Sequence, residues 1–225
     1  SNIRRKTMSS FRKFRREFAS GVLVLSAALV GVAPRIHAQG AMGRDAMGRD
    51  VMGKMDQSMM DQMMGSWPMA SKEAAMFMMK KYGPPAAMTS EMAMWGKTGP
   101  WKRTVVYGHE YVHEFPAHHT DVMQPWVDYK APASMYDELA MYDGSVVLER
   151  TAGEMSARCD KEGANFLALN LAHEIITGKQ TVDGARKMYG EQIVKMKAMQ
   201  SAPYTEKLMF GMMSNTGDMD KPVLK

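Results

Sequence analysis

Residues 101–115 read WKRTVVYGHEYVHEF, and the spacing of their side chains decides whether this region is a strand or a helix. Valine, tyrosine, histidine and phenylalanine recur at every second position from Val105 to Phe115, and Pro116 follows. This alternation is typical of a half-buried β-strand, and the β-branched and aromatic residues before Gly108 disfavour a helix. We therefore predict a long strand over 101–115 that Pro116 ends.

The rest of the chain predicts an α+β domain. An antiparallel sheet of about four to five strands should have helices mainly on one face and end in a C-terminal antiparallel helix pair. An N-terminal hydrophobic segment and a flexible Met-rich linker precede it. The predicted elements are a helix from Ser71 as N-cap to Tyr82, a strand at Met92–Trp95, a strand near 126–129, a helix from Ser134 to Tyr142, a hairpin over 145–159, and helices over 161–177 and from Thr181 to about Met199.

The composition divides the chain into four parts. Residues 1–38 form a signal peptide or a retained membrane anchor, because a basic flank precedes an apolar run at 18–33 that can contact a membrane. A Met- and Gly-rich linker over 39–69 follows, then an exported domain over 70–200 and a tail over 201–225. The body therefore belongs on the periplasmic side of the inner membrane, anchored or exported.

The leader also carries a resemblance. Arg15-Arg16-Glu17-Phe18 resembles the core of a twin-arginine export signal, with Phe14 where Ser or Thr is usual. In the Rieske iron-sulfur subunits of respiratory complexes, such a segment stays in place as the membrane helix. The resemblance implies that retention of residues 1–38 as an anchor is a real alternative to cleavage.

The charge argues against nucleic-acid binding, and the cysteine content excludes an intrachain disulfide. The leader holds 8 of the 29 basic and one of the 24 acidic residues, which leaves 21 basic and 23 acidic residues, a net charge of about −2. A body of this charge is not expected to bind nucleic acid. Cys159 is the single cysteine, so an intrachain disulfide is impossible.

The stretch His109-Glu110-Tyr111-Val112-His113 matches the H-E-x-x-H signature of zinc proteases. As a zinc hydrolase, the chain would use His109, His113 and His119 as ligands and Glu110 as base. That motif requires a helix, whereas on a strand His109 and His113 stand roughly 13 Å apart, too far for one ion. A further hypothesis is a non-catalytic metal site formed by His118, His119 and Asp121 in the loop after the strand.

Methionine is unusually frequent, with 27 residues in 225. Clustered thioethers bind Cu(I), a soft ion, so one hypothesis is a periplasmic copper-binding protein. The opposing interpretation is that methionine fills the core and makes the linker adhesive to an apolar partner. The candidate copper ligands are Met52, Met55, Met59, Met60, Met63 and Met64.

The sequence has no glycine-rich phosphate loop, no G-x-S-x-G elbow and no C-x-x-C motif. We therefore predict a non-enzymatic accessory subunit, without a cofactor, that docks on the protein subunits of a larger membrane assembly. A respiratory or photosynthetic electron-transfer complex is one example of such a host. The copper-binding protein and the zinc hydrolase are the alternatives.

Overall fold

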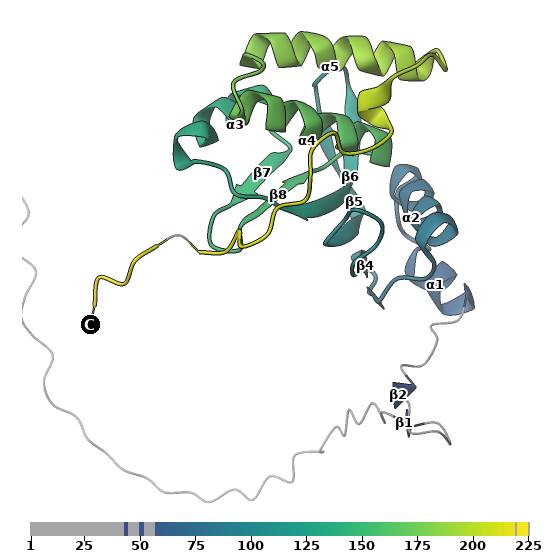
Figure 1. Cartoon of the computed structure of the whole chain (residues 1–225). Coiled ribbons are helices and arrows are strands. Elements are labelled where there is room, and N and C mark those ends of the chain that lie inside the picture. The colour runs from purple at the N-terminus through teal and green to yellow at the C-terminus, as the bar shows by residue number, and fades with distance from the viewer. Residues whose placement is uncertain (1–42, 45–49, 52–56, 219, 225) are drawn as a thin grey trace, which may run out of the picture. The chain divides into compact units, whose positions relative to one another are not determined.

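The computed structural model describes residues 43–44, 50–51, 57–218 and 220–224 (Figure 1). The chain separates into two units, 1–52 and 53–225. In the first, the described residues form an antiparallel pair, β1 (Gly43–Arg44) with β2 (Asp50–Val51). The predicted apolar run at 18–33 lies outside the described residues. Within the described ranges, no helix combines the length and the apolar character that a membrane span requires.

The second unit confirms the α+β class. Its sheet is antiparallel throughout and has six strands in the order β3-β4-β5-β6-β8-β7, more than the four to five predicted. The strands are β3 (Ala87–Met88), β4 (Met92–Trp95), β5 (Arg103–His113), β6 (His119–Asp128), β7 (Val146–Glu149) and β8 (Glu154–Ala157). The helices are α1 (Gln57–Met63), α2 (Met69–Tyr82), α3 (Tyr136–Tyr142), α4 (Glu162–Ile176) and α5 (Val182–Lys197), with 3-10 turns at Ala133–Met135 and Pro203–Thr205.

The predicted long strand is confirmed as β5, and its partner β6 is longer than predicted. β6 runs for ten residues from His119, where we had predicted a loop followed by a short strand near 126–129. The pairing changes register between Val106 and Tyr111. At this irregularity Gly108 donates its amide to the Glu91 carbonyl at 2.7 Å. Extra backbone length at such a bulge lets both halves of β5 pair with one straight partner.

Two apolar clusters fill the space between the sheet and the helices. In one, Val127 and Met155, paired across β6 and β8, pack with Leu167 and Leu171 of α4. In the other, Val106 and Met123, paired across β5 and β6, pack with side chains of α1 and α2. In Figure 1, α5 lies over α4, and α1 and α2 lie beside β4 and β5. The second cluster also contains Met60, Met64, Trp67, Ala74, Ala75 and Met78.

Residues 57–68 therefore belong to the packed body, although the sequence placed them in the linker. Met60, Met64 and Trp67 are each at most 6% exposed. The Trp67 indole also donates Nε1–H to the Ser90 carbonyl at 2.6 Å. The buried methionines of this segment form an apolar face. Burial of this face stabilises the fold because it removes apolar surface from water.

The predicted helix caps are right at one of three positions. Thr181 caps α5, because its side chain accepts a hydrogen bond from the Gly184 amide at 3.1 Å. Ser71 is instead buried inside α2, which begins after Pro68, a residue whose fixed φ suits a helix start. Ser134 lies in the 3-10 turn before α3 and makes no cap.

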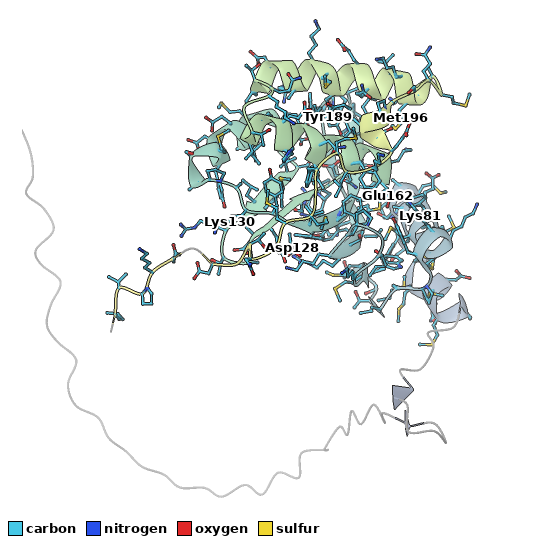
Figure 2. All side chains as sticks on the ribbon, viewed as in Figure 1. Lys81, Asp128, Lys130, Glu162, Tyr189 and Met196 are labelled. Carbon is cyan, nitrogen blue, oxygen red and sulfur yellow. The ribbon has the colours of Figure 1, made fainter. Side chains whose placement is uncertain are left out.

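Buried polar side chains join α2 and the C-terminal segment to α4. Glu162 accepts hydrogen bonds from Lys81, from the Tyr82 hydroxyl at 2.5 Å and from the Trp101 indole at 2.8 Å. Lys81 and Glu162 are neighbours in Figure 2. Further along the same helix, Asn170 is 1% exposed and binds three backbone groups of residues 204–209.

Candidate metal site

The β5–β6 hairpin brings two histidines face to face. His113 is the last residue of β5, His119 is the first of β6, and the two are directly paired. Their ring centroids are 5.0 Å apart. Paired residues of antiparallel strands project from the same face of the sheet, so a turn over 114–118 is enough to place both imidazoles together.

Asp121 completes a cluster of three potential ligands. It lies two residues after His119, so the alternation of β6 returns its side chain to the same face. Its carboxylate oxygens lie 3.3 Å from His113 Nδ1 and 3.1 Å from His119 Nε2. One ligand atom from each of the three residues lies within 4.8 Å of the other two. Asp121 is 1% exposed, His113 17% and His119 21%, so the carboxylate is covered and the imidazoles form the rim.

Each of the three residues has a second polar side-chain atom, and that atom lies close to a neighbouring group. His119 Nδ1 lies 2.9 Å from the Ala117 carbonyl, and His113 Nε2 lies 3.6 Å from Asp143 Oδ1. The Ser145 hydroxyl donates to Asp121 Oδ2. Contacts of this kind orient metal-binding imidazoles and carboxylates and fix the histidine tautomer. They leave His119 Nε2 facing Asp121 Oδ1, whereas His113 Nδ1 lies 3.3 Å from Asp121 Oδ2 and 3.4 Å from the Ser145 hydroxyl oxygen.

Asp121 Oδ1 makes the strongest geometric case for a ligand. It is a buried carboxylate oxygen that makes no aligned hydrogen bond with the described residues, although His119 Nε2 lies 3.1 Å away. Buried carboxylate oxygens are normally satisfied by donors. Two atoms bound to a tetrahedral ion at about 2.0–2.1 Å stand about 3.3 Å apart, close to the observed spacing. The pair therefore has the separation of two ligands of one ion.

In the metal-free cluster, the positive charge of one imidazole offsets the negative charge of the carboxylate. The Asp121 carboxylate, with the Cys159 thiol, raises the pKa of His119 to about 11. Burial acts to raise the pKa of Asp121, but the close contacts with His113 and His119 and the hydrogen bond from Ser145 outweigh it and lower that pKa to about 2. Burial raises the pKa of Asp143. The metal-free site thus holds an imidazolium against a carboxylate, and a dication would replace a proton there.

A cavity gives the cluster a route to solvent. It has a volume of about 190 Å³ and lies between the turn before β6 and helix α5. His119 and Cys159 line its inner side, and Tyr189 and Met196, both labelled in Figure 2, line it from α5. An ion can therefore reach the imidazole edge without opening of the core.

The structure separates the residues of the zinc-hydrolase hypothesis. HEYVH lies on β5 and is extended, so the helix that this motif requires is not formed. His109 is exposed and packs its ring against Tyr111 at 4.7 Å between centroids, away from the cluster. Glu110 accepts a hydrogen bond from the Thr120 hydroxyl at 3.4 Å. Of the three predicted zinc ligands, only His113 and His119 are brought together.

The loop-site hypothesis contained two of the three clustered residues. His119 and Asp121 do converge, but they lie on β6 and not in a loop. His118 is 70% exposed and pairs with Glu114 at 2.8 Å. His113 takes the place that we had given to His118, because the hairpin register pairs position 119 with position 113.

The candidate copper ligands lie in different environments. Met60 and Met64 are 6% and 5% exposed inside an apolar cluster, Met63 is half-buried, and Met59 is 48% exposed. Met52 and Met55 lie outside the described residues. Among the described members, two thioethers therefore serve the core.

Sequence reasoning missed Asp143 and Ser145, which contact His113 and Asp121 of the cluster. The sequence predicted only that a helix ends at Tyr142, just before these residues, and α3 does end there. A signal for the histidine pair was present: 113 and 119 are equidistant from Pro116, the expected turn. Treating 101–128 as one hairpin would have placed them opposite each other.

Comparisons with protein-family models, curated proteins and solved structures found no match to this chain. The functional proposal therefore rests on the geometry of the site.

Proposed function

We propose that the protein binds a divalent transition-metal ion, with zinc as the best fit, through His113, His119 and Asp121. The observation that carries the proposal is the buried Asp121 Oδ1, which faces the His119 imidazole without an aligned hydrogen bond. A bound cation satisfies this oxygen and both imidazoles at once.

The donor set selects the class of metal. Two imidazole nitrogens and one carboxylate oxygen suit zinc and its neighbours in the first transition row. Calcium and magnesium prefer oxygen donors throughout, so they fit this cluster poorly. The backbone carbonyl and the carboxylate behind the imidazoles are the supports that zinc-binding histidines usually have.

We propose a binding site and not a hydrolytic one. A zinc hydrolase needs a general base next to the metal-bound water. The two glutamates of the HEYVHE stretch are engaged elsewhere, Glu110 with Thr120 and the 73%-exposed Glu114 with His118.

Zinc titration of the purified full-length chain, followed by calorimetry, tests the proposal. The wild type should bind one ion per chain. Asp121→Asn and His119→Gln should each weaken binding by about tenfold or more, since the first removes the charge of the carboxylate ligand and the second removes the imidazole ligand. The matched controls are His118→Gln and His109→Gln, which should bind zinc as the wild type does. Absence of binding, or equal losses in all four variants, would refute the site.

Docking on a membrane assembly and Cu(I) binding by the methionines both stay predictions. The twin-arginine-like leader supports the first, and co-purification with other subunits after mild detergent extraction is its test. For the second, Cu(I) affinity should fall when Met59 and Met63 are replaced by leucine. An unchanged affinity would remove those two residues from the candidate ligands.

A further inference from the structure

The backbone fixes Cys159 next to the candidate metal site. Its amide donates to the Met123 carbonyl at 3.1 Å, and its carbonyl accepts from the Met123 amide at 2.9 Å. This isolated bridge continues β8 alongside β6. Because Met123 lies two residues after Asp121, Cys159 projects from the same face as Asp121 and His119.

The sulfur approaches a specific nitrogen of the cluster. Cys159 Sγ lies 3.5 Å from His119 Nε2, the same nitrogen that faces Asp121 Oδ1 at 3.1 Å. In a nucleophilic cysteine–histidine–aspartate triad, the thiol and the carboxylate occupy different nitrogens of the imidazole. Here the other nitrogen, Nδ1, lies 2.9 Å from the Ala117 carbonyl. The sulfur and the carboxylate oxygen therefore approach the same imidazole nitrogen and do not form a relay.

The spacing matches coordination by one ion. A Zn–S bond of about 2.3 Å and a Zn–N bond of about 2.0–2.1 Å at the tetrahedral angle place sulfur and nitrogen about 3.5 Å apart. The observed separation is 3.5 Å. The buried Asp121 Oδ1, which makes no aligned hydrogen bond with the described residues, independently indicates that a ligand belongs here.

We infer that Cys159 is the fourth ligand of the metal held by His113, His119 and Asp121, which makes the site a closed, four-coordinate one. The inference rests on the proposed function. Cys159 Sγ lies near His119 but outside the group of three residues whose ligand atoms are within 4.8 Å of one another. The Cys159 side chain must therefore turn toward the ion to bind it. The thiol loses its proton to solvent as the metal–sulfur bond forms, and no electron is transferred.

Charge balance supports this ligand set. A dication coordinated by one carboxylate and one thiolate forms a neutral unit with the two imidazoles. Neutrality matters because Asp121 is 1% and Cys159 5% exposed, and an uncompensated charge is costly at that depth. A site with four protein ligands leaves no position for a metal-bound water, as in structural zinc sites.

Cobalt(II) substitution of the full-length chain tests the inference. Thiolate-bound cobalt gives an intense ligand-to-metal absorption in the near ultraviolet, and Cys159 is the single cysteine, so this band can come from no other residue. The wild type should show the band, and Cys159→Ser should lose it and bind zinc about tenfold or more weakly. The control is the neighbouring Asp160→Asn, which should keep the band.

The two proposals fail in different ways. The fourth ligand would be overturned if the wild type bound one cobalt or zinc ion without the band and Cys159→Ser bound with equal affinity. The three-residue site would then still stand. A wild type that binds neither metal would overturn both. Alkylation of Cys159 in the unmutated chain gives a measurement independent of variant folding: zinc should slow it, and an unchanged rate counts against the sulfur as a ligand.

Discussion

The carboxylate of Glu154 links β8 to β5, and its partner Arg103 also contacts β6. Arg103 of β5 donates to Glu154 Oε1 at 2.8 Å, and its guanidinium lies 4.4 Å from the ring centroid of Trp126 of β6. Lys102 adds a second cation at 2.7 Å. The hydrogen bond from Arg103, together with that from Lys102, outweighs the effect of burial and lowers the pKa of Glu154. The carboxylate is therefore charged in the fold and contributes to its stability in that form.

The first prediction concerns the loss of this contribution in acid. A carboxyl whose pKa is lower in the folded state stabilises above its usual pKa, and the contribution is lost as the pH falls through the folded pKa. Between about pH 6 and about pH 3, the free energy of unfolding should fall more steeply for the wild type than for Glu154→Gln. Urea unfolding at several pH values measures this. The control, the exposed Glu191→Gln on α5, should follow the wild type, and parallel curves for all three would contradict the prediction.

At the scale of elements, Gly108 decides how closely α1 and α2 approach β5. A Cβ added at position 108 would lie 2.6 Å from the Trp67 indole nitrogen and 3.0 Å from the Glu91 carbonyl oxygen. Both neighbours are held in place, Trp67 by the apolar cluster and Glu91 by its hydrogen bond with the Gly108 amide. Only glycine permits this contact.

The second prediction compares two glycine substitutions whose effects on stability should have opposite signs. Gly108→Ala should destabilise the protein by about 1–3 kcal/mol, because the segment carrying Trp67 must move away from the sheet. Gly190→Ala, within α5 with no atom near the added Cβ, should stabilise it by about 0.5–1 kcal/mol through better helix propensity. Thermal and urea unfolding give both values. A neutral Gly108→Ala would mean that the Trp67 contact does not limit packing.

Local sequence signals identified most elements but not the pairing that makes the site. The alternation of β5, the hairpin of β7 and β8 and the cap at Thr181 depend on neighbouring residues, so they could be read directly. The pairing of His113 with His119 depends on the register across a turn containing Pro116. Asp121 is held by Ser145, and His113 lies beside Asp143, both far away in sequence. Spacing along the chain does not encode these contacts, and it indicates the histidine pair only if 101–128 is treated as one hairpin.

At the scale of the whole molecule, the candidate site joins segments from both halves of the fold. His113, His119 and Asp121 come from the β5–β6 hairpin, and Asp143 and Ser145 come from the connection between α3 and β7. The three proposed ligands lie in the hairpin, and Asp143 and Ser145 support them only in the folded state. Binding of an ion at this site would therefore stabilise the folded chain.

The third prediction follows from this stabilisation. Zinc at about 100 times its dissociation constant should raise the free energy of unfolding by about 2.7 kcal/mol, because it binds the folded chain. Differential scanning calorimetry should show a higher melting temperature with zinc, reversed by a chelator. Asp121→Asn should show little shift. A similar shift in Asp121→Asn would assign the stabilisation to another site.

The three hydrogen bonds of Asn170 bear on where the chain can be shortened. Its amide donates to the carbonyls of Tyr204 and Lys207, at 3.0 and 2.8 Å, and its carbonyl accepts from the Met209 amide at 2.7 Å. A fragment cut at residue 200, the end of the predicted domain, would leave this buried amide without partners and uncover the apolar side of α4. The minimal autonomous fragment should therefore extend past Met209, and a purification tag is better placed at the exposed residues 221–224.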